Sequence, residues 1–204
     1  MINIAAPVID SEERRAVDEV IESGMLAQGP KVAELEKNWA EYCGVKHALA
    51  VNSGTAAIHC ALYAAGVREG DEVITTPYSF IATINPILML GARPVLVDID
   101  EETFNIDVSK IEAAITEKTK AIVPVDLYGQ PCDWAELQEI AKKHNLKIVE
   151  DACQAIGAEY KGIKTGALGD FGCFSLYATK NIMCGEGGIV TTNSDEASAA
   201  IRSF

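Results

Sequence analysis

A single lysine, Lys180, lies in the stretch "GCFSLYATKNIMCGEGG", between a strand-like run and a cluster of glycines. A lysine amine becomes a nucleophile when a partly dry site removes its proton, and a loop that follows a buried strand provides such a site. Many surface loops also carry a lysine that has no chemical role. Lys180 therefore gains meaning only if other segments bring complementary groups to the same place.

The segment "NSGTAAI" has the composition of a phosphate-binding turn. Gly54 and Thr55 follow an apolar strand-like run and open a helix, so that backbone N–H groups and the positive end of the helix dipole point to one spot. Ser53 and Thr55 are also common helix-capping residues, and capping alone remains an alternative. Neither nucleotide-binding pattern, G-x-x-x-x-G-K-[ST] or G-x-G-x-x-G, occurs in this segment.

Three further residues follow apolar runs and extend the set. Asp151 ends "LKIVED", and a carboxylate at the end of a buried strand needs a partner, which a helix cap, a metal or a protonated ring nitrogen would supply. Gln154 follows three positions later. Phe80, in "PYSF", offers an aromatic face to a planar ring or packs in the core.

Taken together, these groups match the requirements of one cofactor. A phosphate seat, a carboxylate for a pyridine nitrogen, an aromatic platform and a lysine are what pyridoxal 5′-phosphate (PLP) needs from a protein. Each signal is weak alone, and their combination predicts a PLP site. The six cysteines form no C-x-x-C pair and have no histidine at metal-ligand spacing, so no metal site is predicted.

The elements that would hold these residues alternate between apolar runs and helical patterns. Continuous apolar strands separated by helices predict an α/β fold, a three-layer α/β/α sandwich with a mainly parallel sheet, in which ligands bind at the carboxyl ends of the strands. Two amphipathic helices before residue 45 predict an N-terminal helical arm, at about residues 1–45, on a single domain of residues 1–204. The predicted strands are "HALAV", "DEVITT", "RPVLVDI", "KAIVPVDL", "LKIVED", "FGCFSLY" and "GGIVTTN".

The composition restricts the kinds of molecule that the protein can bind and the compartment in which we expect it. The 204 residues are 49% hydrophobic and 23% charged, as expected of a globular protein, and their net charge of −13 disfavours nucleic acid and anionic membranes. No apolar run approaches the roughly 18 residues of a membrane span, and the N-terminus lacks the basic start of a signal peptide. The cytoplasm is the expected compartment, where the cysteines would stay reduced.

The chain resembles the N-terminal, large-domain part of the DegT/DnrJ group of nucleotide-sugar aminotransferases, PLP enzymes of the aspartate aminotransferase fold type. The resemblance implies transfer of an amino group from glutamate to a nucleotide-linked keto-sugar, in amino-sugar and cell-surface polysaccharide biosynthesis. It also implies a homodimer, and a C-terminal small domain that these residues do not include. The matching segments are "GMLAQGPKVAELE", "VNSGTAAI", "DEVITTPYSFIATINPILMLGARPVLVDID", "VEDACQAIGAEYKG", "GDFGCFSLYATKN" and "GEGGIVTTN".

The resemblance also assigns roles to the residues. Lys180 would carry the cofactor as a Schiff base, and Asp151 would pair with the pyridinium nitrogen. The phosphate would be held by Gly54, Thr55 and Ser175, while Phe80 would cover the ring and Gln154 would lie near its phenolate oxygen. Similar sugar dehydratases carry His at the position of Lys180, so transamination is favoured over dehydration. Asp126, in "PVDLYG", stands where many relatives have His.

Two alternatives remain, and the first is another reaction on the same fold, such as cysteine desulfuration or an aldol cleavage. Cys184 lies close to Lys180 in sequence, as a cysteine desulfurase on the same fold would require, although its setting in "IMCGEGG" favours a structural role. The other alternative is a truncated, non-catalytic module of the PLP fold that acts as a regulatory partner. The presence of every expected cofactor-contacting residue argues against it.

Overall fold

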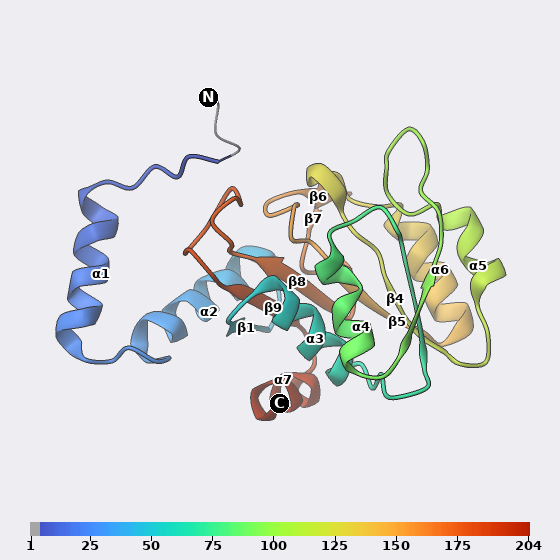
Figure 1. The fold of residues 1–204 in the computed structure, drawn as a ribbon, viewed down its shortest axis with the longest axis horizontal. Coiled ribbons are helices and arrows are strands. Elements are labelled where there is room, and N and C mark those ends of the chain that lie inside the picture. Colours follow the sequence, from blue (N-terminus) through green and yellow to red (C-terminus); the bar gives the residue numbers. More distant parts are fainter. Residues whose placement is uncertain (1–4) are drawn as a thin grey trace.

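The computed structural model describes residues 5–204 and contains a seven-stranded sheet with helices on both faces (Figure 1). The strand order is β1-β9-β8-β5-β4-β2-β3, in which β3, β2, β4, β5 and β8 are parallel and β9 is antiparallel to both of its neighbours. The mainly parallel α/β sandwich is therefore confirmed. Its strands are β1 His47–Val51, β2 Glu72–Thr75, β3 Arg93–Leu96, β4 Thr119–Val123, β5 Lys147–Asp151, β8 Phe171–Ser175 and β9 Gly188–Thr192.

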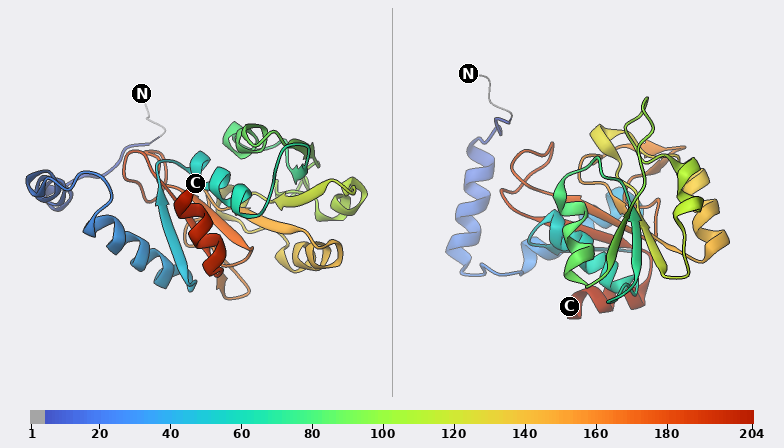
Figure 2. Two further views of the ribbon diagram at one scale, coloured as in Figure 1. Left: turned by 90° about the horizontal axis from the view of Figure 1, so that it is seen from below. Right: turned by 45° about the vertical axis from the view of Figure 1, so that its right-hand side comes forward.

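Two layers of helices bury the faces of this sheet (Figure 2). On one face α3 (Gly54–Ala64), α4 (Asn85–Met89) and α7 (Asp195–Ser203) pack on the strands, and on the other lie α5 (Ile111–Ala114) and α6 (Trp134–His144). Burial on both faces explains why the central strands read as continuous apolar runs. Smaller elements complete the fold: β6 Glu159–Tyr160, β7 Ile163–Lys164, and the 3₁₀ turns η1 Ile81–Thr83, η2 Val108–Lys110 and η3 Leu127–Gly129.

The two N-terminal helices differ in their contacts with this body. The helix α2 (Pro30–Cys43) buries Trp39 against the ring of Phe174, with the ring centroids 5.2 Å apart. The helix α1 (Ser11–Ser23) buries none of its residues and stands apart from the sheet (Figures 1 and 2). The first four residues of the predicted arm lie outside the described residues.

Residues 5–204 contain neither a membrane-spanning helix nor a cluster of metal-ligating side chains. No helix in this range combines the length and the apolar content that crossing a bilayer requires. The same residues contain no group of three or more His, Cys, Asp or Glu side chains that could hold a metal ion.

Candidate active site

A cavity of about 540 Å³ lies where β1, β2, β5 and β8 lead into their following loops. All seven residues that the sequence suggested for the site line this cavity, although they come from separate parts of the chain. Parallel strands bring the loops at their carboxyl ends to one edge of the sheet, which explains this convergence. The lining residues are Ser53, Gly54, Thr55, Phe80, Ala82, Val125, Asp151, Cys153, Gln154, Ser175, Tyr177, Thr179, Lys180 and Glu186.

The N-terminus of α3 forms one wall of the cavity. Ser53 caps this helix, because its Oγ accepts a hydrogen bond from the backbone N–H of Ala56 at 3.1 Å. The capping role of Ser53 therefore does not exclude the binding of a phosphate at the same helix N-terminus. Gly54 lies so close to β8 that an added Cβ would be 2.8 Å from the Cβ of Ser175 and 3.1 Å from the Sγ of Cys153. The absence of a side chain at Gly54 thus lets the helix start pack against the β8 end.

Replacing Gly54 by alanine is expected to lower the free energy of unfolding by about 1–3 kcal/mol, because the new methyl group overpacks the contact with Ser175. It should also weaken PLP binding, since the helix start must move. Urea unfolding and a PLP titration measure the two effects. Gly70→Ala is the control, because a Cβ at Gly70 meets nothing within 4 Å. Its φ of +87° makes alanine strain the backbone there, but Gly70 does not line the cavity. Equal PLP affinity of Gly54→Ala and Gly70→Ala would contradict the prediction.

Asp151 supplies a buried carboxylate to the cavity. Its Oδ2 accepts a hydrogen bond from the hydroxyl of Thr83 at 2.7 Å, and its Oδ1 accepts one from the backbone N–H of Cys153 at 3.2 Å. Turns, not a helix, follow β5, so the helix-cap alternative is wrong. No ion pair between residues 5 and 204 involves Asp151. A buried carboxylate with this environment is suited to a cationic group inside the cavity.

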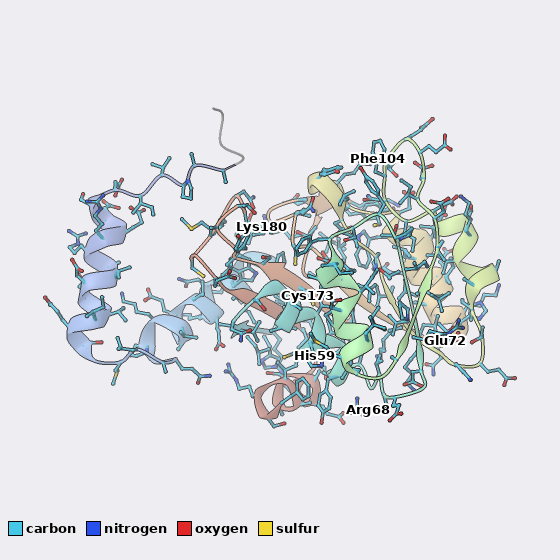
Figure 3. All side chains as sticks on the ribbon, viewed as in Figure 1. His59, Arg68, Glu72, Phe104, Cys173 and Lys180 are labelled. Atoms are coloured by element: carbon cyan, nitrogen blue, oxygen red, sulfur yellow. The ribbon has the colours of Figure 1, made fainter. Side chains whose placement is uncertain are left out.

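Lys180 reaches the same cavity from the loop between β8 and β9 (Figure 3). Its backbone N–H donates to the carbonyl of Tyr177 at 2.9 Å, which closes a turn, and its side chain is half-buried. Throughout the described chain, none of the ion pairs includes Lys180. The fold thus places an amine with no ion-pair partner and a buried carboxylate around one cavity.

The remaining predicted residues differ in exposure. Phe80 caps η1 at its N-terminus and is 71% exposed, so it lines the cavity without belonging to the core. The Oε1 of Gln154 accepts a hydrogen bond from the backbone N–H of Tyr128 at 3.2 Å, which leaves its amide hydrogens for another partner. Ser175 is buried, and its Oγ accepts a hydrogen bond from the backbone N–H of Tyr177 at 3.3 Å.

Sequence reasoning missed several residues of the site. Tyr177 and Thr179 line the cavity from the turn that ends at Lys180, and Glu186 does so from the glycine-rich end of the same loop. Thr83 was also missed, although "PYSFIAT" places it three positions after Phe80. Its buried hydroxyl orients Asp151 and in turn contacts the Oγ of Ser79 at 2.8 Å. No sequence signal separates such a threonine from an ordinary core residue.

The two cysteines near the site do not supply a reactive thiolate. Burial, followed by the charge of Asp151, raises the pKa of Cys153 well above its usual range, so its thiol stays protonated. Cys184 lies outside the cavity lining, its Sγ donates to the carbonyl of Glu186 at 3.1 Å, and burial raises its pKa as well. This placement disfavours the cysteine desulfurase alternative.

The residues around the cavity fit PLP. The N-terminus of α3 offers backbone donors for a phosphate, Asp151 offers a negative charge for a protonated ring nitrogen, and Lys180 offers an amine for the aldehyde. A volume of about 540 Å³ lies within the range of small-ligand pockets.

Comparison with known proteins supports this interpretation. GDP-perosamine synthase from Caulobacter vibrioides is 50% identical over 202 residues, which are 98% of this chain and 54% of that protein. The spore coat polysaccharide biosynthesis protein SpsC from Bacillus subtilis is 50% identical over 196 residues, or 96% of this chain and 50% of SpsC. The crystal structure of NtdA from Bacillus subtilis, with bound cofactor PMP, matches with a TM-score of 0.90 and 36% identity, over 100% of this chain and 48% of NtdA.

The chain spans about half the length of the curated relatives that it matches. The model of the DegT/DnrJ/EryC1/StrS aminotransferase family matches residues 7–204. This match extends over nearly the whole chain and includes every residue of the candidate site. The chain therefore belongs to the DegT/DnrJ/EryC1/StrS aminotransferase family.

Proposed function

We propose that the protein containing this chain is a PLP-dependent aminotransferase that transfers an amino group from glutamate to a nucleotide-linked keto-sugar. The observation that carries the proposal is the cavity that brings together Lys180, Asp151 and the N-terminus of α3. Membership of an aminotransferase family and similarity to a GDP-perosamine synthase support the sugar substrate. Similarity to a spore coat polysaccharide protein supports a role in polysaccharide biosynthesis.

In this proposal each wall of the cavity has its own task. Gly54 and Thr55 at the α3 N-terminus, with Ser175, hold the phosphate of the cofactor. Asp151, oriented by Thr83, keeps a proton on the ring nitrogen. Bound PLP supplies an electron sink for the carbanion that transamination requires.

The other side chains bind the cofactor or take part in the reaction of the amino donor. Lys180 anchors the cofactor and, as a free amine, its Nζ takes the proton from the α-carbon of the amino donor. Phe80 shields one ring face from water. Gln154, whose Oε1 is occupied by the backbone of Tyr128, presents its amide hydrogens to an oxygen of the cofactor.

Cofactor attachment is the first test of this proposal. Purified protein is mixed with PLP, its absorbance is recorded, and borohydride reduction followed by mass spectrometry locates the modified lysine. A phosphopyridoxyl group on Lys180 supports the proposal. A folded whole protein that carries the label only on other lysines, or carries none, contradicts it. Formation of 2-oxoglutarate from glutamate, dependent on a nucleotide-linked keto-sugar, then tests the substrate class.

We further propose that the protein acts as a homodimer. The helix α1 leaves two apolar side chains in solvent, Val17 at 57% and Ile21 at 59% exposure, and Met25 and Leu26 after it are exposed as well. An apolar stripe on a helix that buries none of its residues in its own chain is typical of a surface that another subunit covers. The family resemblance supports a second copy as that subunit.

The double substitution of Val17 and Ile21 by glutamate is expected to weaken the dimer by about tenfold or more, since two exposed apolar anchors become charged. Analytical ultracentrifugation over a concentration series measures the change. Because α1 buries no residue in its own chain, the unfolding midpoint of the monomer should stay constant. Glu22→Ala, on the polar side of α1, serves as the control. A wild-type protein that is monomeric throughout the series would refute the dimer.

The cytoplasm is the compartment that we propose. All six cysteines are free thiols within residues 5–204, and Cys43, Cys132 and Cys173 are buried. A reducing compartment keeps thiols in this state.

A further inference from the structure

Two acidic side chains, Asp126 and Glu150, are completely buried beside the candidate site. Asp126 follows β4, and Glu150 is the residue of β5 directly before Asp151. Neighbouring residues of a strand point to opposite faces, so Glu150 lies on the side of the sheet away from Asp151. No ion pair in the described part of the chain includes Asp126 or Glu150. Two buried anions without a cation would be strongly destabilising.

Hydrogen bonds satisfy three of the four oxygens of this pair. The Oδ1 of Asp126 accepts from the backbone N–H of Cys132 at 2.8 Å and from the indole N–H of Trp134 at 3.2 Å. The backbone N–H of Gly166 donates to the Oε1 of Glu150 at 2.7 Å, and the Oε2 receives a longer contact of 3.4 Å from the next turn.

The fourth oxygen, Oδ2 of Asp126, is buried and has no hydrogen-bond partner within residues 5–204 while both acids are treated as carboxylates, which only accept. Nearly all buried polar atoms in proteins have a partner, so this atom calls for a donor. The side chain of Glu150 lies within hydrogen-bonding range of Asp126, and a carboxylic acid supplies one O–H donor.

We propose that Glu150 retains a proton at neutral pH and that its O–H donates a hydrogen bond to the Oδ2 of Asp126. The two side chains then form a buried acid–carboxylate pair that positions the Asp151 and Gln154 side of the cavity. Burial, together with the negative charge of Asp126, raises the pKa of Glu150 well above its ordinary value. Burial also raises the pKa of Asp126, to about 6, against the effect of its N–H donors.

The titratable side chains around the pair include three thiols. Three cysteines face the pair, one each from α2, the turn before α6, and β8. The nearest charged groups act on these cysteines: Lys164, whose amine donates to Glu159 at 3.1 Å, on the first, Asp133 on the second and Asp151 on the third. Burial raises the pKa of each of these thiols, so all three stay neutral. They are Cys43, Cys132 and Cys173.

The pair is connected to the cavity through the backbone. The N–H of Asp126 donates to the carbonyl of Asp151 at 3.1 Å, and the carboxylate of Asp126 closes the following turn at Cys132. Within that turn Tyr128 has a left-handed φ of 55°, and its N–H donates to the side chain of Gln154. Asp126 and Glu150 are therefore positioning residues, which act on the cavity through Asp151 and Gln154.

A retained proton makes stability depend on pH in a defined direction. Below its ordinary pKa, Glu150 is protonated in both the folded and the unfolded chain. Above that value only the folded chain holds the proton, and each further pH unit lowers the folding equilibrium constant by up to about tenfold, until the folded pair also loses its proton. The stabilisation is thus present in acid and is lost as pH rises.

Glu150→Gln tests the pair, because the amide of glutamine donates the same hydrogen bond without titrating. Wild-type protein at pH 7 should show the infrared band of a protonated carboxylic acid that persists in the folded state, and Glu150→Gln should lack it. Between pH 5 and pH 9, the free energy of unfolding measured with urea should fall less steeply with pH in Glu150→Gln than in the wild type. The difference between the two slopes should correspond to the binding of one proton. Glu139→Gln, exposed on α6, is the matched control and should leave both measurements unchanged.

Hydrogen exchange tests the positioning role. In wild-type protein the amides of Tyr128 and Cys132 should lose protection at high pH beyond the intrinsic rate increase, and in Glu150→Gln they should keep it. Absence of the acid band from folded wild-type protein, or equal pH slopes in wild type and Glu150→Gln, would overturn the proposal. The band is measured on the wild-type chain alone, so it remains decisive even if the variant does not fold.

Discussion

Replacing Lys180 by alanine is expected to lower glutamate-dependent turnover of the whole protein by at least about 10³-fold, because general acid–base catalysis and covalent attachment would be lost together. The fold should persist, since Lys180 lies in a loop, is half-buried and belongs to no ion pair between residues 5 and 204. Steady-state formation of 2-oxoglutarate gives the change in kcat, and borohydride reduction shows whether any other lysine is labelled.

The design of this experiment separates chemistry from folding. Lys142→Ala removes an exposed lysine of α6 and should retain full activity. Added methylamine should restore part of the turnover of Lys180→Ala, since a small free amine can take the proton that Nζ would take. Appreciable transamination by Lys180→Ala without added amine would remove Lys180 from the mechanism.

Asp151→Asn is expected to reduce turnover by about 10³-fold. Asparagine keeps an acceptor for the N–H of Cys153 but removes the negative charge that would face a protonated ring nitrogen. Two unit charges about 4 Å apart interact by about 4 kcal/mol at an effective dielectric constant of 20, which corresponds to roughly three powers of ten. The measurements are kcat and the PLP dissociation constant, and both should worsen.

A second asparagine variant controls for the loss of charge. Asp133→Asn removes an exposed carboxylate that forms no side-chain cap on α6, and its activity should match the wild type. If Asp151→Asn retains turnover within a few-fold of the wild type, its carboxylate serves the hydrogen bond from Thr83 and not the cofactor.

The sequence predicts the layers of this fold because its local patterns and its tertiary packing agree. The run that contains Ile148 and Val149 is apolar on both faces, and the structure buries these two side chains under helices on opposite sides. The position of β1 was not predictable, because its antiparallel contact with β9 joins segments that lie far apart in sequence. Nothing in "HALAV" specifies that partner.

The candidate site was predictable where its residues sit directly at strand ends. Asp151 ends β5, and Ser175 ends β8, so the strand pattern locates both of them. Thr83 and Glu186 were not predictable, since each reaches the cavity region through the conformation of an irregular segment. Asp126 was recognisable as a departure from the family pattern, but only the fold brings it next to Glu150.

The position of β1 at the edge of the sheet affects the order in which parts of the chain fold during synthesis. Within the described sheet, β1 has β9 as its single neighbour, so the strand that leads into α3 is paired with the strand of this sheet that is synthesised last. On the ribosome, β1 leaves the exit tunnel first of the seven strands and waits unpaired while the others follow. Such distant pairing slows folding and leaves an open strand edge exposed in the meantime. The turn at the start of α3, to which we assign the cofactor phosphate, therefore follows a strand that gains its partner only after β9 has been made.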